Sequence, residues 1–154
     1  MKVKIEKSVN IFNKRARFEY EILEEYEAGI VLTGTEIKSL RSSKASITES
    51  FCQFIEDELY IINMMIDEYK LGTFYNHKTK RERKLLLHNY ELQKLKKKLK
   101  DVGNTIIPLK LYINNNGKAK LLISLARGKK LYDKREAIKE RENKVHIQRL
   151  LKKN

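Results

Sequence analysis

Three glutamates in the stretch EEYEAG are the residues best suited to chemistry: Glu24, Glu25 and Glu27. Clustered carboxylates can hold a divalent metal, as nucleases do. Apolar and polar residues alternate around them with a period of two, which predicts a strand. Glu24 and Glu25 would then point to opposite faces of that strand, so the spacing argues against a metal-bound nuclease site.

The other groups that support catalysis are sparse. The three histidines, His77, His88 and His146, lack metal-ligand spacing. No pattern of a nucleophilic Ser or Cys and no Gly-rich phosphate loop occurs. The single cysteine, Cys52, excludes an internal disulfide and fits a small buried strand residue in a reducing compartment. We therefore expect no catalytic residue, no metal, no cofactor and no enzyme activity.

Charge is the strongest compositional signal. The chain of 154 residues carries 34 Lys and Arg against 20 Asp and Glu, a net charge of +14. Such an excess favours a polyanionic partner, with nucleic acid ahead of an anionic membrane surface. No apolar run approaches the roughly 18 residues of a membrane span, and the N-terminus does not resemble a signal peptide. We expect a cytoplasmic protein with no membrane partner.

The first half of the chain predicts strands and a short helix. Alternation begins at Phe18, Gly29 permits a bend or bulge, and IVLTG continues the strand. Residues 33–44 have helical spacing, with Thr33 or Thr35 as the cap. The next two apolar runs, SFCQFI and LYIINMMI, predict a hairpin around Glu56, Asp57 and Glu58.

The second half contains the clearest helix and the clearest hairpin. After a basic loop over 69–84, Leu92, Leu95, Leu99 and Val102 follow helical spacing. His88 or the better capping residue Asn89 would start this helix, and Gly103 would stop it. In residues 105–126, alternating strands flank Asn116-Gly117, which favours a two-residue turn, and Pro108 would stand at a strand's start.

These elements predict a mainly β fold. About six antiparallel strands in a short chain favour a small closed barrel of the oligonucleotide-binding type, with two to three peripheral helices. Residues 1–130 would form this domain, and 131–154 a separate basic tail.

The tail is unusual in composition. Residues 127–154 hold eleven Lys or Arg and four acidic residues. They include too little apolar surface to offset the entropy of ordering. Leu131, Ile138 and Val145 nevertheless recur every seven residues, and Leu150 and Leu151 add an apolar end. We expect a segment that is disordered alone and helical along RNA; the alternative is a charged tail that only aids solubility.

Three long motifs in their order resemble one family. NKRARFEYEILEEYEAGIVLTGTEIKSLRSSKA (13–45), RKLLLHNYELQKL (83–95) and LARGKKLYDKREAIKERE (125–142) are similar to the bacterial small protein B family, the SsrA-binding proteins. The resemblance implies an oligonucleotide-binding-like barrel that binds the tRNA-like domain of tmRNA. It further implies delivery of tmRNA to stalled ribosomes for rescue and peptide tagging, in a complex with elongation factor Tu. The tail would enter the vacant mRNA channel and the decoding centre of the small subunit.

The resemblance also assigns residues. The RNA-contacting positions that it implies are Asn13, Lys14, Arg15, Glu27, Leu86, Lys120, Gly128, Lys129 and Lys130. The ribosome-contacting positions that it implies in the tail are Tyr132, Asp133, Lys134 and Arg135, followed by Leu150 and Leu151. Tyr132 stands where the family commonly has a stacking His, and Thr79-Lys80 replaces a Pro-Thr pair, so no contact is assigned to 78–82. A single RNA-binding face suggests a monomer.

Simpler interpretations remain for several of these residues. The simpler interpretation of Glu27 is a solvated acidic residue at the end of a strand. The simpler interpretation of Leu86 is a core residue, although three successive leucines cannot all face one core. Lys120 and Lys118 occupy the polar side of the last strand, where Lys110 would face them. The rival function is that of a general barrel RNA-binding or ribosomal protein whose tail only adds charge.

Overall fold

A computed structural model describes residues 9–72 and 74–129 of the chain. The predicted tail of residues 131–154 and Lys130 lie outside the described residues. The helices and strands are β1 (Asn10–Phe12), α1 (Ala16–Glu19), β2 (Tyr20–Ile30), α2 (Gly34–Arg41), β3 (Ala45–Ser46), β4 (Phe51–Ile55), β5 (Glu58–Ile62), β6 (Met65–Ile66), β7 (Arg83–Leu86), α3 (Asn89–Lys98), β8 (Asn104–Ile113) and β9 (Ala119–Gly128).

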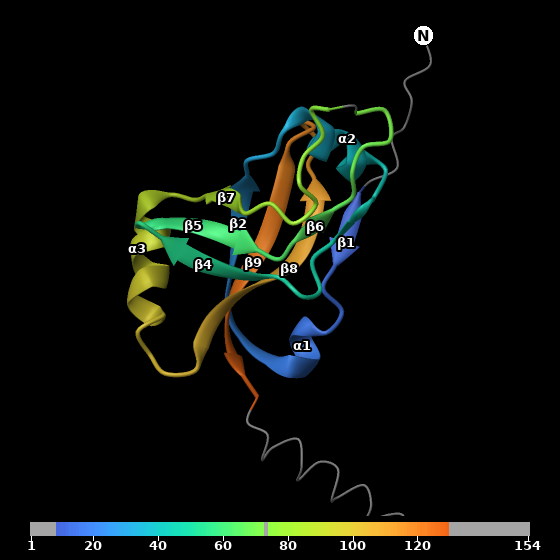
Figure 1. The fold of residues 1–154 in the computed structure, drawn as a ribbon. Helices are drawn as coiled ribbons and strands as arrows, with labels where there is room; N and C mark the ends of the chain where they lie inside the picture. The colour runs from blue at the N-terminus through green and yellow to red at the C-terminus, as the bar shows by residue number, and fades with distance from the viewer. Residues whose placement is uncertain (1–8, 73, 130–154) are drawn as a thin grey trace, which may run out of the picture.

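Six strands close into a barrel. The order is β8-β4-β5-β7-β2-β9, and β9 pairs again with β8, which closes the ring. Every pairing is antiparallel, β1 adds to the outside of β8, and β3 and β6 form a separate small ribbon. Helix α3 stands at one side of the barrel, α2 covers the opposite end, and α1 lies near the start of β2 (Figure 1). The predicted small antiparallel barrel with peripheral helices is confirmed.

The barrel is filled by the alternating residues of its strands. Leu59 and Ile61 from β5 are fully buried, as are Leu121 and Ile123 from β9. A second, smaller cluster joins Ile107, Leu109 and Ala126 to Ala16 of α1. The two clusters lie on opposite sides of β8, because Ile106 and Ile107 alternate between them. A bulge between Pro108 and Lys110 then returns Leu111 to the main cluster. Pro108 therefore lies at a mid-strand bulge rather than at the predicted strand start.

The N-terminal region differs from the prediction. Residues 10–12 form a strand and residues 16–19 a helical turn, so β2 starts at Tyr20 rather than at Phe18, which is 70% exposed. The strand ends at Ile30, so only the first residue of IVLTG belongs to it. Its register shift lies between Ile22 and Glu24 rather than at Gly29.

The early helix and hairpin are confirmed, but both are shorter than predicted. The helix ends at Arg41, and the run LYIINMMI is divided: β5 ends at Ile62, and Met65–Ile66 form β6, which pairs with β3. Thr33 caps α2, and its backbone N–H donates to the Glu36 carboxylate at 2.9 Å. The turn of the β4–β5 hairpin is Glu56-Asp57, with φ of 50° and 69°, and Glu58 already belongs to β5. A two-residue turn with two positive φ angles matches strand twist even without glycine.

The start of α3 agrees with one of the two predicted caps, but its end does not agree with the prediction. His88 rather than the preferred Asn89 is the N-cap, and a short strand, β7, precedes it where the sequence pattern suggested none. The helix ends at Lys98, so Val102 lies beyond it and is 98% exposed. Gly103, with φ of 88°, forms the turn into β8 instead of stopping the helix directly.

The β8–β9 hairpin is confirmed, but its turn is longer than predicted. The loop runs from Asn114 to Lys118, whose carbonyl accepts the Asn114 N–H at 2.9 Å. The Asn114 side chain accepts the N–H groups of Asn116 and Lys118, at 3.1 and 2.9 Å, and only Gly117 has a positive φ. Hydrogen bonds to the side-chain amide of Asn114 thus stabilise this longer loop in place of a two-residue turn. Within the described ranges, no helix is long and apolar enough to cross a membrane.

Candidate nucleic-acid interface

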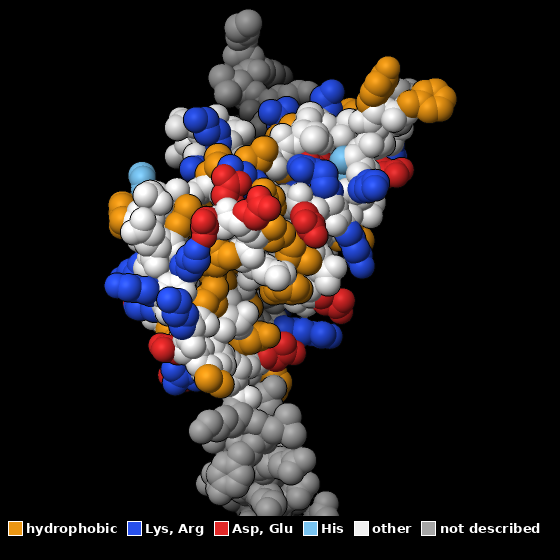
Figure 2. All heavy atoms as spheres, turned by 60° about the vertical axis from the view of Figure 1, so that its left-hand side comes forward, with side chains coloured by type: hydrophobic (Ala, Val, Ile, Leu, Met, Phe, Trp, Pro, Cys, Tyr) orange, Lys and Arg blue, Asp and Glu red, His pale blue; other side chains and the backbone are white. Residues whose placement is uncertain are grey.

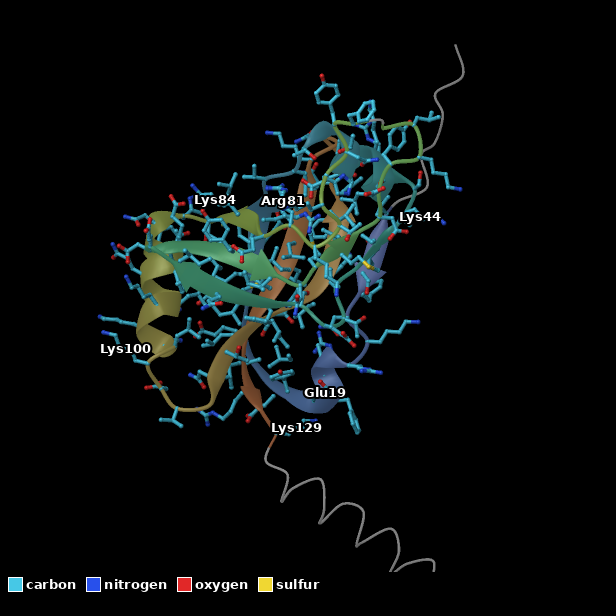
Figure 3. The ribbon with its side chains drawn as sticks, viewed as in Figure 1. Glu19, Lys44, Arg81, Lys84, Lys100 and Lys129 are labelled. Carbon is cyan, nitrogen blue, oxygen red and sulfur yellow. The ribbon has the colours of Figure 1, made fainter. Side chains whose placement is uncertain are left out.

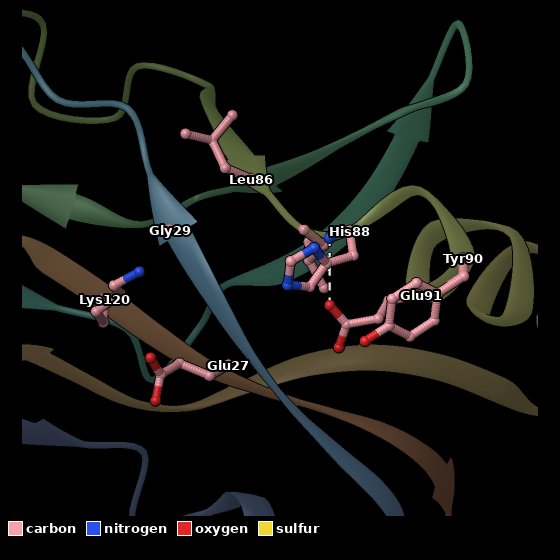
Figure 4. A pocket seen from close by; sticks show the side chains of 8 residues that line it. Glu27, Gly29, Leu86, His88, Tyr90, Glu91 and Lys120 are labelled. Atoms are coloured by element: carbon pink, nitrogen blue, oxygen red, sulfur yellow. Dashed lines mark hydrogen bonds between the residues drawn. The ribbon is translucent and has the colours of Figure 1, made fainter.

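Three of the predicted RNA-contacting residues meet on the outside of the barrel. In the strand register, Lys120 of β9 pairs with Gly29 of β2, and Gly29 pairs with Leu86 of β7. Glu27 lies two residues before Gly29 and projects on the same face. The side chains of Glu27, Leu86 and Lys120 thus surround Gly29 (Figure 4).

An open hollow of about 570 Å³ lies between them, which we call the barrel hollow. Its lining residues are Glu27, Gly29, Leu86, Leu87, His88, Tyr90, Glu91 and Lys120. Gly29 contributes no side chain, so it leaves the floor open between Leu86 and Lys120. The hollow therefore combines a cation, a carboxylate and an apolar side chain around bare backbone.

Leu86 is exposed because successive residues of a strand point to opposite faces of the sheet. Leu85 points into the core with 2% of its surface exposed, and Leu86, the next residue of β7, points outward with 52% exposed. Leu87 packs against the main core from the end of the strand. One leucine of the three is thus available for contact, as the sequence predicted, and core burial of Leu86 is excluded.

Glu27 has an aromatic neighbour. Tyr112 pairs with Lys120 across the β8–β9 hairpin, and its hydroxyl lies near the Glu27 carboxylate. Partial burial and this carboxylate raise the pKa of Tyr112 to about 12, so the hydroxyl stays a donor at neutral pH. Lys110 lies 4.9 Å from the centre of the Tyr112 ring and 5.5 Å from that of Phe12. Lys110 thus belongs to the same face as Lys120, as predicted, but it sits over aromatic rings.

The other predicted contacts within the described residues gather elsewhere, around α1. Asn13 has a structural part: its side-chain NH₂ donates to the Pro108 carbonyl at 2.9 Å and its backbone N–H to that of Leu109. Its amide oxygen is buried and has no hydrogen-bond partner among the described residues. Lys14 and Arg15 follow on the surface and are exposed.

Gly128 and Lys129 complete this second group. Gly128 pairs with Tyr20 at the start of β2, nine residues before the Gly29–Lys120 pair. The Lys129 N–H donates to the Glu19 carbonyl at 3.0 Å, and its Nζ donates to that of Arg17 at 3.1 Å. The structure therefore separates the α1 group (Asn13, Lys14, Arg15, Gly128 and Lys129) from the barrel hollow. Lys130, Tyr132, Asp133, Lys134, Arg135, Leu150 and Leu151 lie outside the described residues.

The loop with the unusual Thr79-Lys80 pair is fixed to α2. Arg83 is fully buried, pairs with Glu36, and donates to the Met64 carbonyl at 2.7 Å. Arg81 pairs with the same carboxylate. Burial alone would raise the pKa of Glu36, but the Arg81 and Thr33 hydrogen bonds and the Arg83 charge hold that pKa below its usual value. Thr79 takes part through its carbonyl, which accepts the Ile66 N–H at 2.9 Å.

Sequence reasoning missed the aromatic residues of the hollow. The rings of His88 and Tyr90 stack with centres 5.4 Å apart and planes at 10°, and Tyr90 is 71% exposed. The signal was present as two ring-bearing residues two positions apart beside RKLLL, but the helical pattern assigned His88 only to a cap and Tyr90 only to the helix. Throughout the described part of the chain, no three His, Cys, Asp or Glu residues are grouped to hold a metal ion.

Comparison with known proteins identifies the family. The sequence model of the family described as SmpB protein matches residues 10–153. The chain belongs to the SmpB protein family. An SsrA-binding protein of Flavobacterium psychrophilum is 59% identical over 146 residues, 95% of this chain and 97% of that protein. An SsrA-binding protein of Fervidobacterium nodosum is 51% identical over 142 residues, 92% of this chain and 95% of that protein.

A solved structure resembles this one as well. One chain of the study "tmRNA-SmpB: a journey to the center of the bacterial ribosome" is 51% identical, with a TM-score of 0.67. The match covers 80% of this chain and 86% of that one. The barrel described above is therefore shared with a solved structure, and the family resemblance from the three sequence motifs is confirmed.

Proposed function

We propose that this chain is an RNA-binding adaptor of trans-translation: it binds the tRNA-like domain of tmRNA and delivers it to stalled ribosomes. One observation of the structure carries the proposal. Glu27, Leu86 and Lys120, three positions far apart in the sequence, line one exposed hollow. The relatives named SsrA-binding protein, and the solved chain from a tmRNA-SmpB study, supply the identity of the RNA.

Each residue of the hollow suits a different part of an RNA. Lys120 carries the charge that neutralises a phosphate. The Glu27 carboxylate repels phosphates, but it can accept hydrogen bonds from a base N–H or a 2′-OH, which gives recognition rather than affinity. The half-exposed Leu86 offers an apolar surface to a base or a sugar. A charge, an acceptor and an apolar contact together favour a defined RNA shape over any polyanion.

The α1 group would form a second contact of the same RNA. Lys14, Arg15 and Lys129 are exposed cations around one helical turn, and Lys130 would extend the group. Asn13 and Gly128 support them: Asn13 fastens the turn to β8, and Gly128 ends β9 beside it. Two separated contacts fix the orientation of a folded RNA, which one contact cannot do.

The tail would act on the ribosome. We assign it the vacant mRNA channel and the decoding centre, with Tyr132 stacking on a ribosomal base and Asp133, Lys134 and Arg135 beside it. Leu150 and Leu151 would anchor its apolar end. Ribosome rescue and tagging of the nascent peptide would follow, with elongation factor Tu in the complex. The protein would act as a cytoplasmic monomer without catalytic activity.

A binding titration tests this function. It compares the tRNA-like domain of tmRNA, an ordinary tRNA and an unstructured RNA of equal length at two salt concentrations. Because phosphate contacts weaken with salt while shape recognition weakens less, the account predicts a preference for the tRNA-like domain that persists at higher salt. Equal binding of the three RNAs, lost together as salt rises, would instead support a general RNA-binding protein.

A further inference from the structure

Helix α3 carries a basic surface outside the barrel hollow. Its residues line an adjoining open hollow of about 440 Å³, which we call the α3 hollow. The lining residues are Tyr90, Gln93, Lys94, Lys96, Lys97 and Lys100. Figure 2 is turned so that the α3 side of the molecule comes forward, and it shows Lys and Arg side chains gathered there. No carboxylate contributes to this lining.

Several lysines of α3 have structural partners. Lys98 and Lys94 both pair with Glu24 of β2, and Lys96 pairs with Asp57 in the β4–β5 turn. Leu95 is fully buried, and the Lys98 carbonyl accepts the Asn104 side chain at 3.0 Å. These contacts fix the helix to the barrel, so its outer face has a set position relative to the barrel hollow.

Lys97 and Lys100 remain available. Both are exposed, and neither forms a salt bridge with any of the described residues. Lys97 lies in the last turn of α3, and Lys100 lies in the turn just after it, where its N–H donates to the Lys97 carbonyl at 3.3 Å. Both line the α3 hollow, with Gln93 one helical turn before Lys97. Lys100 points away from the barrel, on the opposite side of the molecule from Lys44 (Figure 3). Two unpaired cations on a rigid support are suited to phosphates.

Tyr90 joins the two hollows because it lines both. Its ring stacks on His88 and is otherwise largely open to solvent. A ring held in place by a second ring is a pre-positioned platform for a base, since every base has a stacking face. Tyr90 thus connects the hollow that holds Lys120 with the hollow that holds Lys97.

We propose that RNA held in the barrel hollow continues over α3, with one unpaired base stacked on Tyr90 and backbone phosphates at Lys97 and Lys100. This inference rests on the proposed function, and it adds an interaction surface to the family-matched residues. The partner is RNA because the surface combines a stacking ring with unpaired cations and a polar Gln93.

The test measures the affinity of the tRNA-like domain by fluorescence anisotropy across a salt series. Tyr90→Ser removes the ring and should weaken binding by about fivefold to about 150-fold, with little change in the salt slope. Tyr90→Phe keeps the ring and should bind within about twofold of wild type. The double variant Lys97→Gln/Lys100→Gln should lower the salt slope by about two.

The matched control is Lys44→Gln/Lys70→Gln, which removes two exposed charges. Lys44 lies on the opposite side of the molecule from Lys100 (Figure 3), and Lys70 follows Tyr69, whose ring contacts Lys38 of α2. Thermal melts check that each variant is folded. Wild-type affinity in Tyr90→Ser, or a slope in the α3 variant equal to that of the control, would overturn the inference. If Lys120→Ala weakens binding while the α3 variants do not, only this inference fails. If the wild type shows no preference for the tRNA-like domain, the proposed function fails first.

Discussion

Leu86 of β7 stands directly opposite Gly29 of β2, and a Cβ on Gly29 would come within 3.3 Å of the Leu86 Cβ. Opposed residues of antiparallel strands usually hold their Cβ atoms about 4.5–5.5 Å apart. The strands approach more closely here because Gly29 has no side chain. This approach sets the position of Leu86 over the hollow and keeps the hollow open toward Lys120.

Gly29→Ala should therefore destabilise the barrel by about 1–3 kcal/mol, because β2 and β7 must move apart. It should also weaken binding of the tRNA-like domain, since the new methyl group enters the hollow. Urea denaturation measures the first effect and a binding titration the second. Gly34→Ala is the control, because a Cβ there has no neighbour within 4 Å. A Gly29→Ala protein as stable as wild type would refute the steric argument.

Substitutions of Lys120 and Glu27 should weaken RNA binding in different ways. Lys120→Ala removes one phosphate contact, so the slope of log affinity against log salt should fall by about one. Glu27→Gln removes an acceptor, so affinity for the tRNA-like domain should fall with the slope unchanged. Lys44→Ala serves as the control for a lost surface charge. An unchanged slope in Lys120→Ala would remove Lys120 from the contacts.

The buried Glu36–Arg83 pair should dominate acid stability. Glu36→Gln leaves Arg83 buried without its counter-charge and should cost about 3–5 kcal/mol at neutral pH. Because the folded-state pKa of Glu36 is lowered, its contribution is complete above the unfolded value of about 4.3 and is lost as pH falls through the folded value. Urea denaturation at several pH values should show a shallower acid limb for Glu36→Gln. A parallel acid limb in both proteins would contradict this assignment.

Cys52 should be inert in the folded protein. The side chain is 5% exposed on β4, and burial raises the pKa of the thiol, so little thiolate forms. A thiol reagent at mildly alkaline pH should label the native protein only at the rate of unfolding and the urea-unfolded protein at once. Rapid labelling of the native protein would show that β4 opens locally.

Patterns of alternation predicted most of the barrel. The apolar residues of β9, Leu121 and Ile123 among them, are buried as their period of two requires. The predicted boundaries failed where a tertiary contact overrides a local preference. Pro108 lies in mid-strand because a β-bulge next to it interrupts the regular hydrogen bonding. Strand β7 was not predicted because it is too short to show a periodic pattern. Residues 10–12 became a strand only because β8 offers a partner edge.

The candidate site was predicted in part, by family resemblance rather than by physics. The outward position of Leu86 could be foreseen, since successive residues of a strand alternate faces. The meeting of Lys120 with Glu27 could not, because it depends on the register of β2 against β9. Tyr90 and Tyr112 were missed because the sequence alone does not show whether an aromatic side chain is exposed; that depends on its neighbours in the fold. The separation of Asn13 from the hollow likewise depends on tertiary contacts, the hydrogen bonds of Asn13 to Pro108 and Leu109 of β8.

The most direct test of the adaptor account is peptide tagging in a reconstituted translation reaction on a message without a stop codon. One protein carries the natural residues 131–154, and the other carries the same residues in scrambled order, with the charge unchanged. The account predicts that both bind the tRNA-like domain equally, because the barrel holds the RNA, and that only the natural tail supports tagging. Full tagging by the scrambled tail would contradict the account and leave the tail as a source of charge.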